Sequence, residues 1–285
     1  MRTFAALLCA VLCSGATDDP RVEDALYRVS QEASVLWQKA PHFMAREAVV
    51  QKALKGKKAR MRFGLGAAAV ARPKPQFETR EIVSFYSLGS LKDSPEVVRE
   101  FRHILSLDGK SFGDEDTARE KFARELRSGD LVKEDLRQEF EKSCVAGAAT
   151  DFGQLILLFT KPNLSKYRFE FTGDTRIGVD NAWLIGFTQQ GGNESLHISE
   201  GSKKMKEKLQ GEIAVRQGDY LPLRITLNSS HNREDNEIRD EAKLDYAVIS
   251  GTLLPAALVY RRFVNDEMVL ESIYRYSDWQ PIPAK

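Results

Sequence analysis

Residues Tyr167 to Gln189 read YRFEFTGDTRIGVDNAWLIGFTQ, with an apolar side chain at every second position on both sides of a glycine-containing break. Successive side chains of a β-strand point to opposite faces, so this alternation predicts two strands that share one apolar and one polar face. We expect the chain to continue as strands to its C-terminus. The further predicted strands lie at residues 155–159, 213–215, 223–227, 242–248, 254–263 and 269–279.

Short turn signals separate these predicted strands. They are Gly173-Asp174, Gly191-Gly192, Gly218-Asp219, Gly251 and Asn265-Asp266. Connections this short join antiparallel neighbours, because a parallel pair needs a crossover of about a dozen residues or more. The C-terminal half is therefore predicted to be an antiparallel meander with one apolar face that other elements must cover.

The N-terminal half is predicted to hold a helix and then strands. Asp19 caps and Pro20 opens a helix over residues 21–39, in which apolar side chains recur at helical spacing. The pattern of residues 45–54 fits either a helix or a strand. Further strands are predicted at residues 60–64, 80–88 and 97–107, the last of which ends at the turn Asp108-Gly109.

Residues 114–143 are dense in charge and predict two amphipathic helices, divided at Gly129-Asp130. Their apolar stripe consists of Phe122, Leu126, Leu131, Leu136 and Phe140. A single stripe of this kind packs onto a sheet or binds a partner protein, and packing onto the sheet is the favoured interpretation.

The first 16 residues have the pattern of a secretory signal peptide, with Arg2, an apolar run and then Ser14-Gly15-Ala16. We predict that residues 17–285 form a single β domain with a helical insertion at residues 114–143. Cys9 and Cys13 fall within the signal, so Cys144 alone remains and no internal disulfide is expected. An exported chain of this length without disulfides indicates the periplasm of a bacterium with two membranes.

The charge is balanced, with 42 Lys and Arg residues against 41 Asp and Glu residues. This balance argues against nucleic acid as a partner, because that affinity comes mostly from a basic surface. Lysines cluster at residues 52–62 and 203–208. These clusters fit either a solvated strand edge or a peripheral contact with anionic lipid heads.

No catalytic or metal-binding constellation stands out, so we expect neither an enzyme nor a cofactor or metal. The run GLGAAA at residues 64–69 resembles a dinucleotide-binding loop only weakly, because prolines follow where a helix should form. The four histidines are isolated, without the spacing of metal ligands. Asp240 and Glu241 belong to an acidic hairpin that we expect to lie in water.

The apolar face of the predicted sheet is large compared with the helices that are available to cover it. Such a mismatch leaves an apolar cavity, which suits a lipid or an acyl chain. The alternative is that the helices and the sheet fill each other completely, and the sequence does not separate the two.

The motifs in VDNAWLIGFTQ, GEIAVR and LPLRITLN, at residues 179–189, 211–216 and 221–228, resemble the outer-membrane lipoprotein carrier (LolA-like) superfamily. The resemblance covers residues 167–279 and the N-terminal helix. It implies a mainly β (α+β) fold, in which a twisted antiparallel sheet forms a half-barrel. The N-terminal helix and the inserted helical pair would cover this half-barrel around an acyl-chain cavity. The helical pair departs from the superfamily's pattern, and no carrier-specific residue is carried over.

We therefore expect an exported, periplasmic, non-enzymatic binder of a lipid, an acyl chain or a lipidated protein. The first alternative is a periplasmic interaction or scaffold protein with a solid core, and the last is a hydrolase of envelope material that uses Asp240 or Glu241. The oligomeric state is left open. The residues expected to line the cavity are Phe169, Phe171, Ile185, Phe187, Ile225 and Leu227.

Overall fold

The structure is a computed structural model that describes residues 19–55, 75–91, 94–128, 132–146, 151–192, 208–233 and 236–282. The predicted signal peptide, the predicted strand at residues 60–64 and the run at residues 64–69 lie outside these ranges. Most residues of the two lysine clusters also lie outside these ranges.

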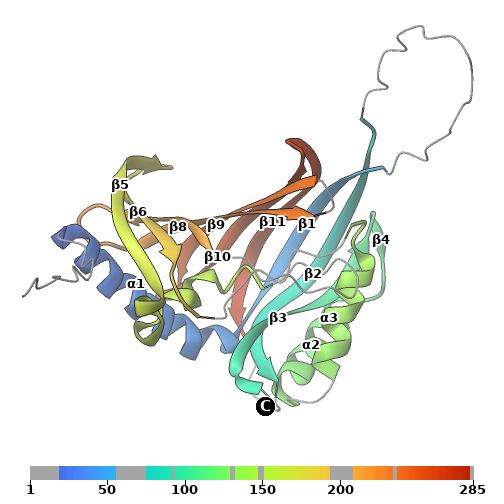
Figure 1. The fold of residues 1–285 in the computed structure, drawn as a ribbon. Helices are drawn as coiled ribbons and strands as arrows, with labels where there is room; N and C mark the ends of the chain where they lie inside the picture. The colour runs from blue at the N-terminus through green and yellow to red at the C-terminus, as the bar shows by residue number, and fades with distance from the viewer. Residues whose placement is uncertain are drawn as a thin grey trace, which may run out of the picture.

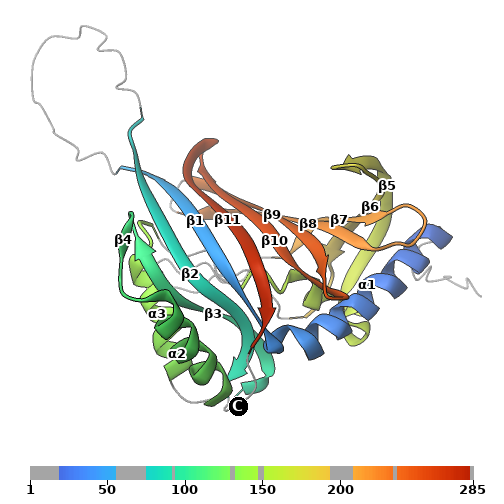
Figure 2. The ribbon, with the colours of Figure 1, turned by 180° about the vertical axis from the view of Figure 1, so that it is seen from behind.

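One antiparallel sheet of 11 strands dominates the described residues, in the order β4-β3-β2-β1-β11-β10-β9-β8-β7-β6-β5. The sheet is open and strongly curved, with α1 below it and α2 and α3 at one end (Figures 1 and 2). The predicted mainly β half-barrel is thus confirmed. The strands are β1 Phe43–Leu54, β2 Phe77–Leu91, β3 Ser94–Leu107, β4 Lys110–Ser111, β5 Tyr167–Ile177, β6 Asp180–Gln189, β7 Gln210–Arg216, β8 Pro222–Arg233, β9 Asn236–Ile249, β10 Thr252–Val264 and β11 Glu267–Pro281. The helical segments are α1 Pro20–Lys39, η1 Ala40–His42, α2 Glu115–Ser128, α3 Val132–Ser143, η2 Leu155–Phe159 and η3 Lys161–Lys166.

Strands β5 to β11 form the predicted meander, with one correction at its first turn. Gly173-Asp174 is not a turn, because β5 continues through a register shift between Phe171 and Gly173. Gly173 has a φ of 148°, which few other residues adopt, and the glycine serves a bulge inside the strand. The chain reverses instead at Gly178, which has a φ of 61°.

The ambiguous residues 45–54 belong to strand β1. This strand pairs with β2 on one side and with the C-terminal β11 on the other, so it joins the N-terminal strands to the meander. Its buried and more exposed side chains alternate along most of its length. Pairing with a strand more than 200 positions away is not visible in a local pattern, and this explains why the sequence leaves β1 undecided.

The sheet has an inner face, which we define by one row of directly paired residues across eight strands. The row consists of Ile185, Ile213, Ile225, Leu244, Leu258, Tyr274, Val49 and Ile82, all at most 1% exposed. Helix α1 packs against the same core cluster through buried side chains at helical spacing, among them Ala25, Val29 and Leu36. The Asp19 side chain caps α1 by accepting a hydrogen bond from the Arg21 N–H at 2.9 Å, as predicted.

Helices α2 and α3 confirm the predicted helical pair, but their apolar stripe is divided between two clusters. Phe122 of α2 lies against Phe85 on the outer face, the face opposite the inner one, with ring centroids 6.3 Å apart. Leu136 of α3 joins the same outer cluster, whereas Phe140 joins the inner core cluster. The pair therefore covers the β2–β3 end of the sheet and leaves the inner face of β5–β10 to other elements.

Residues 155–159 form the 3-10 helix η2 and not the predicted strand. The run LILLF is apolar at every position, so it has no period-two pattern to place in a half-buried strand. Leu155, Ile156 and Phe159 are buried between α1 and the sheet. This segment covers part of the inner face that the α-helices alone leave uncovered.

Candidate functional site

The residues predicted to line a cavity lie on the inner face. Ile185, Phe187, Ile225 and Leu227 are at most 2% exposed, and Phe169 is 7% exposed. Phe171 is half-buried, and the Arg21 guanidinium lies 3.6 Å from the centre of its ring. The sheet brings all six together on β5, β6 and β8, and other parts of the protein bury five of the six side chains.

The ring of Phe159 covers the part of the predicted lining that Phe169 and Phe187 form. Its centroid lies 5.5 Å from that of Tyr167, 6.0 Å from that of Phe169 and 4.9 Å from that of Phe187. Phe159 is 0% exposed. Offset or edge-on aromatic contacts at these separations add to the stability that burial provides. The place that the sequence assigns to a guest is therefore occupied by an aromatic side chain of η2.

We call residues 151–166, which include η2 and η3, the strap. One end of the strap is attached to Glu100 of β3, whose carboxylate accepts hydrogen bonds from the N–H groups of Asp151 and Gly153, each at 2.6 Å. At the other end the Lys166 carbonyl accepts hydrogen bonds from the N–H groups of Gln190 and Gly191. Both ends are therefore held by polar bonds to strand β3 or to the residues that follow β6.

Gly153 is required at the first attachment by the space around it. A Cβ at this position would lie 2.2 Å from the Tyr86 hydroxyl and 2.7 Å from a Glu100 carboxylate oxygen. The Tyr86 hydroxyl in turn donates to Glu100 at 2.9 Å. Only a residue without a side chain lets the backbone approach this closely.

The middle of the strap is held mainly by apolar packing. Among the hydrogen bonds of the described residues, one links η2 to the sheet, from the Ile156 N–H to the Tyr246 hydroxyl at 3.1 Å. The other backbone bonds of η2 stay within the strap. Removing η2 from the inner face would therefore break one hydrogen bond to the sheet and expose apolar side chains.

A buried ion cluster lies beside the strap, where Arg102 pairs with two glutamates. Its guanidinium donates to both Glu47 oxygens at 2.8 and 2.9 Å, and it lies 3.0 Å from a Glu100 oxygen. The guanidinium also faces the rings of Phe140 and Tyr86 at 4.4 and 5.0 Å from their centres. Burial raises the pKa of the Glu47 carboxyl, and Arg102 opposes that shift.

Cys144 lies near this cluster and is a packed residue. Burial is the main cause that raises the pKa of its thiol to about 12. The thiolate is the reactive form, so the neutral thiol at physiological pH is a poor nucleophile.

A second ion pair on the inner face corrects the expectation for Asp240. This residue is 1% exposed and does not lie in water: its carboxylate accepts hydrogen bonds from Tyr260 at 2.6 Å and from Arg262 at 2.9 and 3.3 Å. Glu241 follows it in the strand, so its side chain points to the outer face, where it pairs with Arg239. The two carboxylates therefore cannot act together on one substrate.

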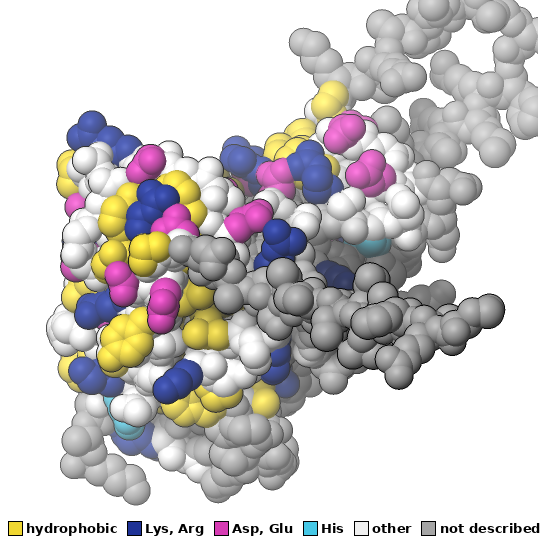
Figure 3. Space-filling view, turned by 60° about the vertical axis from the view of Figure 1, so that its left-hand side comes forward, with side chains coloured by type: hydrophobic (Ala, Val, Ile, Leu, Met, Phe, Trp, Pro, Cys, Tyr) yellow, Lys and Arg dark blue, Asp and Glu magenta, His cyan; other side chains and the backbone are white. Residues whose placement is uncertain are grey.

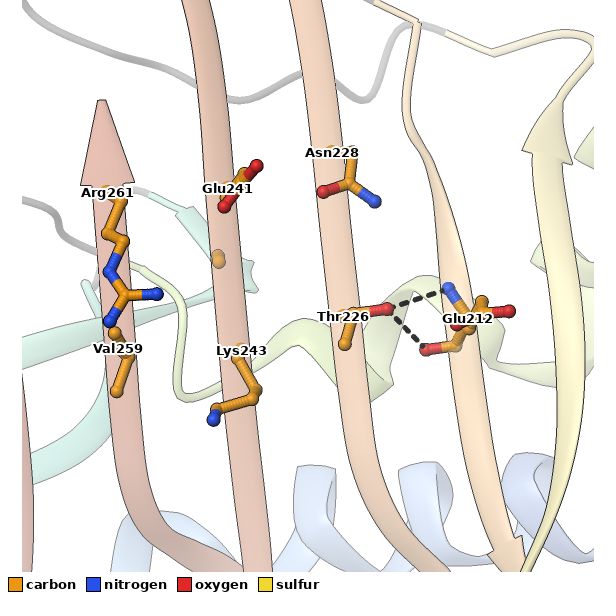
Figure 4. Close-up of a pocket in the computed structure, with 8 residues that line it drawn as sticks. Glu212, Thr226, Asn228, Glu241, Lys243, Val259 and Arg261 are labelled. Atoms are coloured by element: carbon orange, nitrogen blue, oxygen red, sulfur yellow. Dashed lines mark hydrogen bonds between the residues drawn. The ribbon is translucent and has the colours of Figure 1, made fainter. Parts of the chain in front are cut away.

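The outer face of β7–β10 has a shallow groove of about 320 Å³. Figure 4 shows the side chains that line it on neighbouring strands, with Thr226 hydrogen-bonded to the Glu212 backbone. The lining residues are Glu212, Thr226, Asn228, Glu241, Ala242, Lys243, Val259 and Arg261. This lining is mostly polar and lies on the face opposite the predicted apolar residues, so it does not suit an acyl chain.

Exposed hydrophobic side chains are scattered over the described surface. They include Tyr27 on α1 and Val179 at the β5–β6 turn, which are 65% and 85% exposed. Figure 3, seen from the side of α1 and β5, shows hydrophobic groups interspersed with charged ones. Scattered groups of this kind do not define a contact surface.

The described residues hold neither a metal-binding cluster nor a membrane-spanning helix. No group of three or more His, Cys, Asp or Glu side chains in those residues is placed to hold a metal ion. None of the described helices is long and apolar enough to cross a membrane.

The strap and its attachment are not predicted from the sequence. The signal for η2 was present, because LILLF is apolar without alternation and is bounded by Gly153 and Pro162. No local signal marks Glu100 as the attachment point, because its partners lie about 50 positions away in the chain.

No protein-family model and no curated protein sequence matches this chain. Its fold resembles that of a DUF1329 family protein from Desulfovibrio piger, with a TM-score of 0.36 and 11% identity over 91% of this chain and 92% of that one. It also resembles an outer membrane lipoprotein-sorting protein domain from Vibrio parahaemolyticus, with a TM-score of 0.35 and 10% identity over 91% and 93%. The second is of the class that the sequence motifs resemble. At these TM-scores the likeness carries no functional argument.

Proposed function

We propose that this protein is an exported, non-enzymatic binder of a hydrophobic ligand, and that it takes a lipid, an acyl chain or a lipidated protein on the inner face of its sheet. The observation that carries the proposal is η2, an entirely apolar segment that lies between α1 and the predicted lining residues and has one hydrogen bond to the sheet. In this proposal η2 occupies the ligand-binding site when no ligand is bound.

The apolar burial that an acyl chain gains on the inner face is at least as large as the burial that η2 loses. Burying an aliphatic or aromatic side chain contributes about 1.5–3 kcal/mol, so the three buried side chains of η2 contribute roughly 5–9 kcal/mol. An acyl chain of about twelve carbons contributes roughly 9 kcal/mol at ~0.8 kcal/mol per CH₂ group. An apolar guest therefore compensates for the burial that is lost when η2 leaves, and a polar guest does not.

The non-enzymatic part of the proposal rests on the placement of the acidic side chains. Asp240 is buried and paired, and Glu241 lies on the opposite face, so the hydrolase alternative has no acid–base pair here. Export to the periplasm rests on the sequence of residues 1–16. Cell fractionation with an antibody to the mature chain tests it: recovery of the chain in the cytoplasm would contradict export.

A second function, that of an interaction or scaffold protein with a solid core, is favoured by a different observation. Five of the six predicted lining side chains are buried by the protein's own atoms, and Phe159 packs against two of them, Phe169 and Phe187. If η2 never leaves the inner face, this core is a permanent one and the protein has no place for a lipid.

A displacement assay separates the two functions. The purified protein is titrated with a dansyl-labelled fatty acid, and unlabelled dodecanoic acid is then added below its micellar concentration. The binding function predicts saturable fluorescence enhancement that the unlabelled acid reverses. A signal that does not saturate, or that the competitor does not reverse, supports the solid-core function.

A further inference from the structure

A polar cluster lies on the inner face directly beside the predicted apolar lining. It consists of Ser229 of β8, Asp240 of β9, and Tyr260 and Arg262 of β10, all at most 6% exposed. Ser229 pairs directly with Asp240, and Asp240 with Arg262, so the three side chains lie in one row on the same face. We call these four residues the anchor cluster.

The hydroxyl of Ser229 is the unusual member of the anchor cluster. It is buried, yet its oxygen has no hydrogen-bond partner among the residues that the structure describes. A buried hydroxyl without a partner costs roughly 1–3 kcal/mol, and such groups are uncommon in native proteins. Ser229 is therefore a group that a ligand would satisfy, either as donor or as acceptor.

The anchor cluster is continuous with the proposed acyl-chain site. Leu227, one of the predicted lining residues, precedes Ser229 by two positions on the same face of β8. Phe152 of the strap covers Tyr260, with ring centroids 5.5 Å apart. Phe152 lies at the attached end of the strap, so an acyl chain that replaces η2 on the apolar lining would end next to the anchor cluster.

The charges of the anchor cluster select against an anionic head. Arg262 is already paired with both oxygens of Asp240, so the ion pair is electrically neutral. Burial and the Asp240 carboxylate raise the pKa of the Tyr260 hydroxyl, which keeps it protonated and neutral. A carboxylate that entered this cluster would lose its hydration and would meet the negative charge of Asp240.

We propose that the anchor cluster binds the ester or hydroxyl head of an uncharged acyl lipid, so that the inner face prefers glyceryl esters to free fatty acids. This inference rests on the proposed function, because the acyl chain must first replace η2. It adds the chemical class of the head: neutral, with hydrogen-bonding oxygen atoms, at the end of an apolar chain.

The test compares two probes with the same acyl chain, monolauroylglycerol and dodecanoic acid, in the displacement assay at pH 8. Monolauroylglycerol is expected to bind about fivefold more tightly or better, since one neutral hydrogen bond contributes about 1 kcal/mol. In Ser229→Ala its affinity should fall by about fivefold, while that of dodecanoic acid stays within about twofold. Ser230→Ala, a change at an exposed neighbour on the other face, should leave both affinities unchanged.

Thermal unfolding of the ligand-free variants supplies the second measurement. Ser229→Ala should unfold at the same temperature as the wild type or higher, because the substitution removes an unsatisfied hydroxyl. Equal affinity for the two probes, tighter binding of dodecanoic acid, or equal losses for both in Ser229→Ala would overturn the inference and leave the binding function standing. Failure of both probes to bind would overturn both.

Discussion

Replacing Phe159 by alanine tests whether η2 leaves the inner face when a ligand binds or is part of a permanent core. The ring is 0% exposed and packs against Tyr167, Phe169 and Phe187. Truncating a buried phenylalanine costs about 3–5 kcal/mol, which lowers the unfolding temperature of a chain of this size by roughly 6–20 °C. Phe112→Ala is the matched control, because Phe112 is 55% exposed and its removal should change stability by no more than about 0.5 kcal/mol.

The same substitution should increase the affinity for an acyl chain. Without the ring, η2 loses less buried surface when it leaves the inner face, and the vacated volume lies against the predicted lining. If about 3 kcal/mol of that cost disappears, the affinity for monolauroylglycerol rises by up to about 100-fold. The assay is the same fluorescence displacement, with thermal unfolding in the presence and absence of the lipid. A variant that is destabilised but binds no more tightly would refute the view that η2 competes with the guest.

Two further predictions concern the attachment of the strap and the ion cluster. Gly153→Ala should cost about 1–3 kcal/mol in urea unfolding, since its Cβ would meet the Tyr86 hydroxyl at 2.2 Å. Gly191→Ala, where a Cβ meets nothing within 4 Å, should be neutral, and equal losses in the two variants would contradict the steric reason. Arg102→Met should cost about 3–5 kcal/mol at pH 7.5, because it leaves two buried glutamates without their cation. That cost should shrink as the pH falls toward about 4. Without Arg102, the pKa of the buried Glu47 carboxyl rises further above its value in the unfolded chain. At low pH this carboxyl is protonated, so the folded protein no longer holds an unpaired buried charge. A loss that is independent of pH would show that lost packing dominates.

The strands of the meander could be predicted because their signal is local. An apolar residue at every second position, as in Tyr167, Phe169 and Phe171, reports one covered face without reference to any distant segment. The same local reasoning failed at Gly173, where a glycine and an acid in sequence look like a turn but serve a bulge. A turn and a bulge both need glycine's backbone freedom, so the residue type alone does not separate them.

The contents of the inner face could not be predicted, because they depend on contacts between distant segments. Arg102 and Glu47 are 55 positions apart, and no local pattern in either segment indicates that they pair. The prediction for Asp240 is wrong for the same reason, since its partner Arg262 lies on the neighbouring strand, 22 positions away. Alternation identifies which face is covered, but not which charged residues are paired on it.

Hydrogen–deuterium exchange of the strap, with and without monolauroylglycerol, tests the central claim most directly. If the guest replaces η2, amides of residues 155–159 should exchange faster in the bound protein, while those of β6 and β8 beneath the lipid should exchange more slowly. Slower or unchanged exchange in residues 155–159 at saturating lipid would contradict the replacement of η2 by the guest.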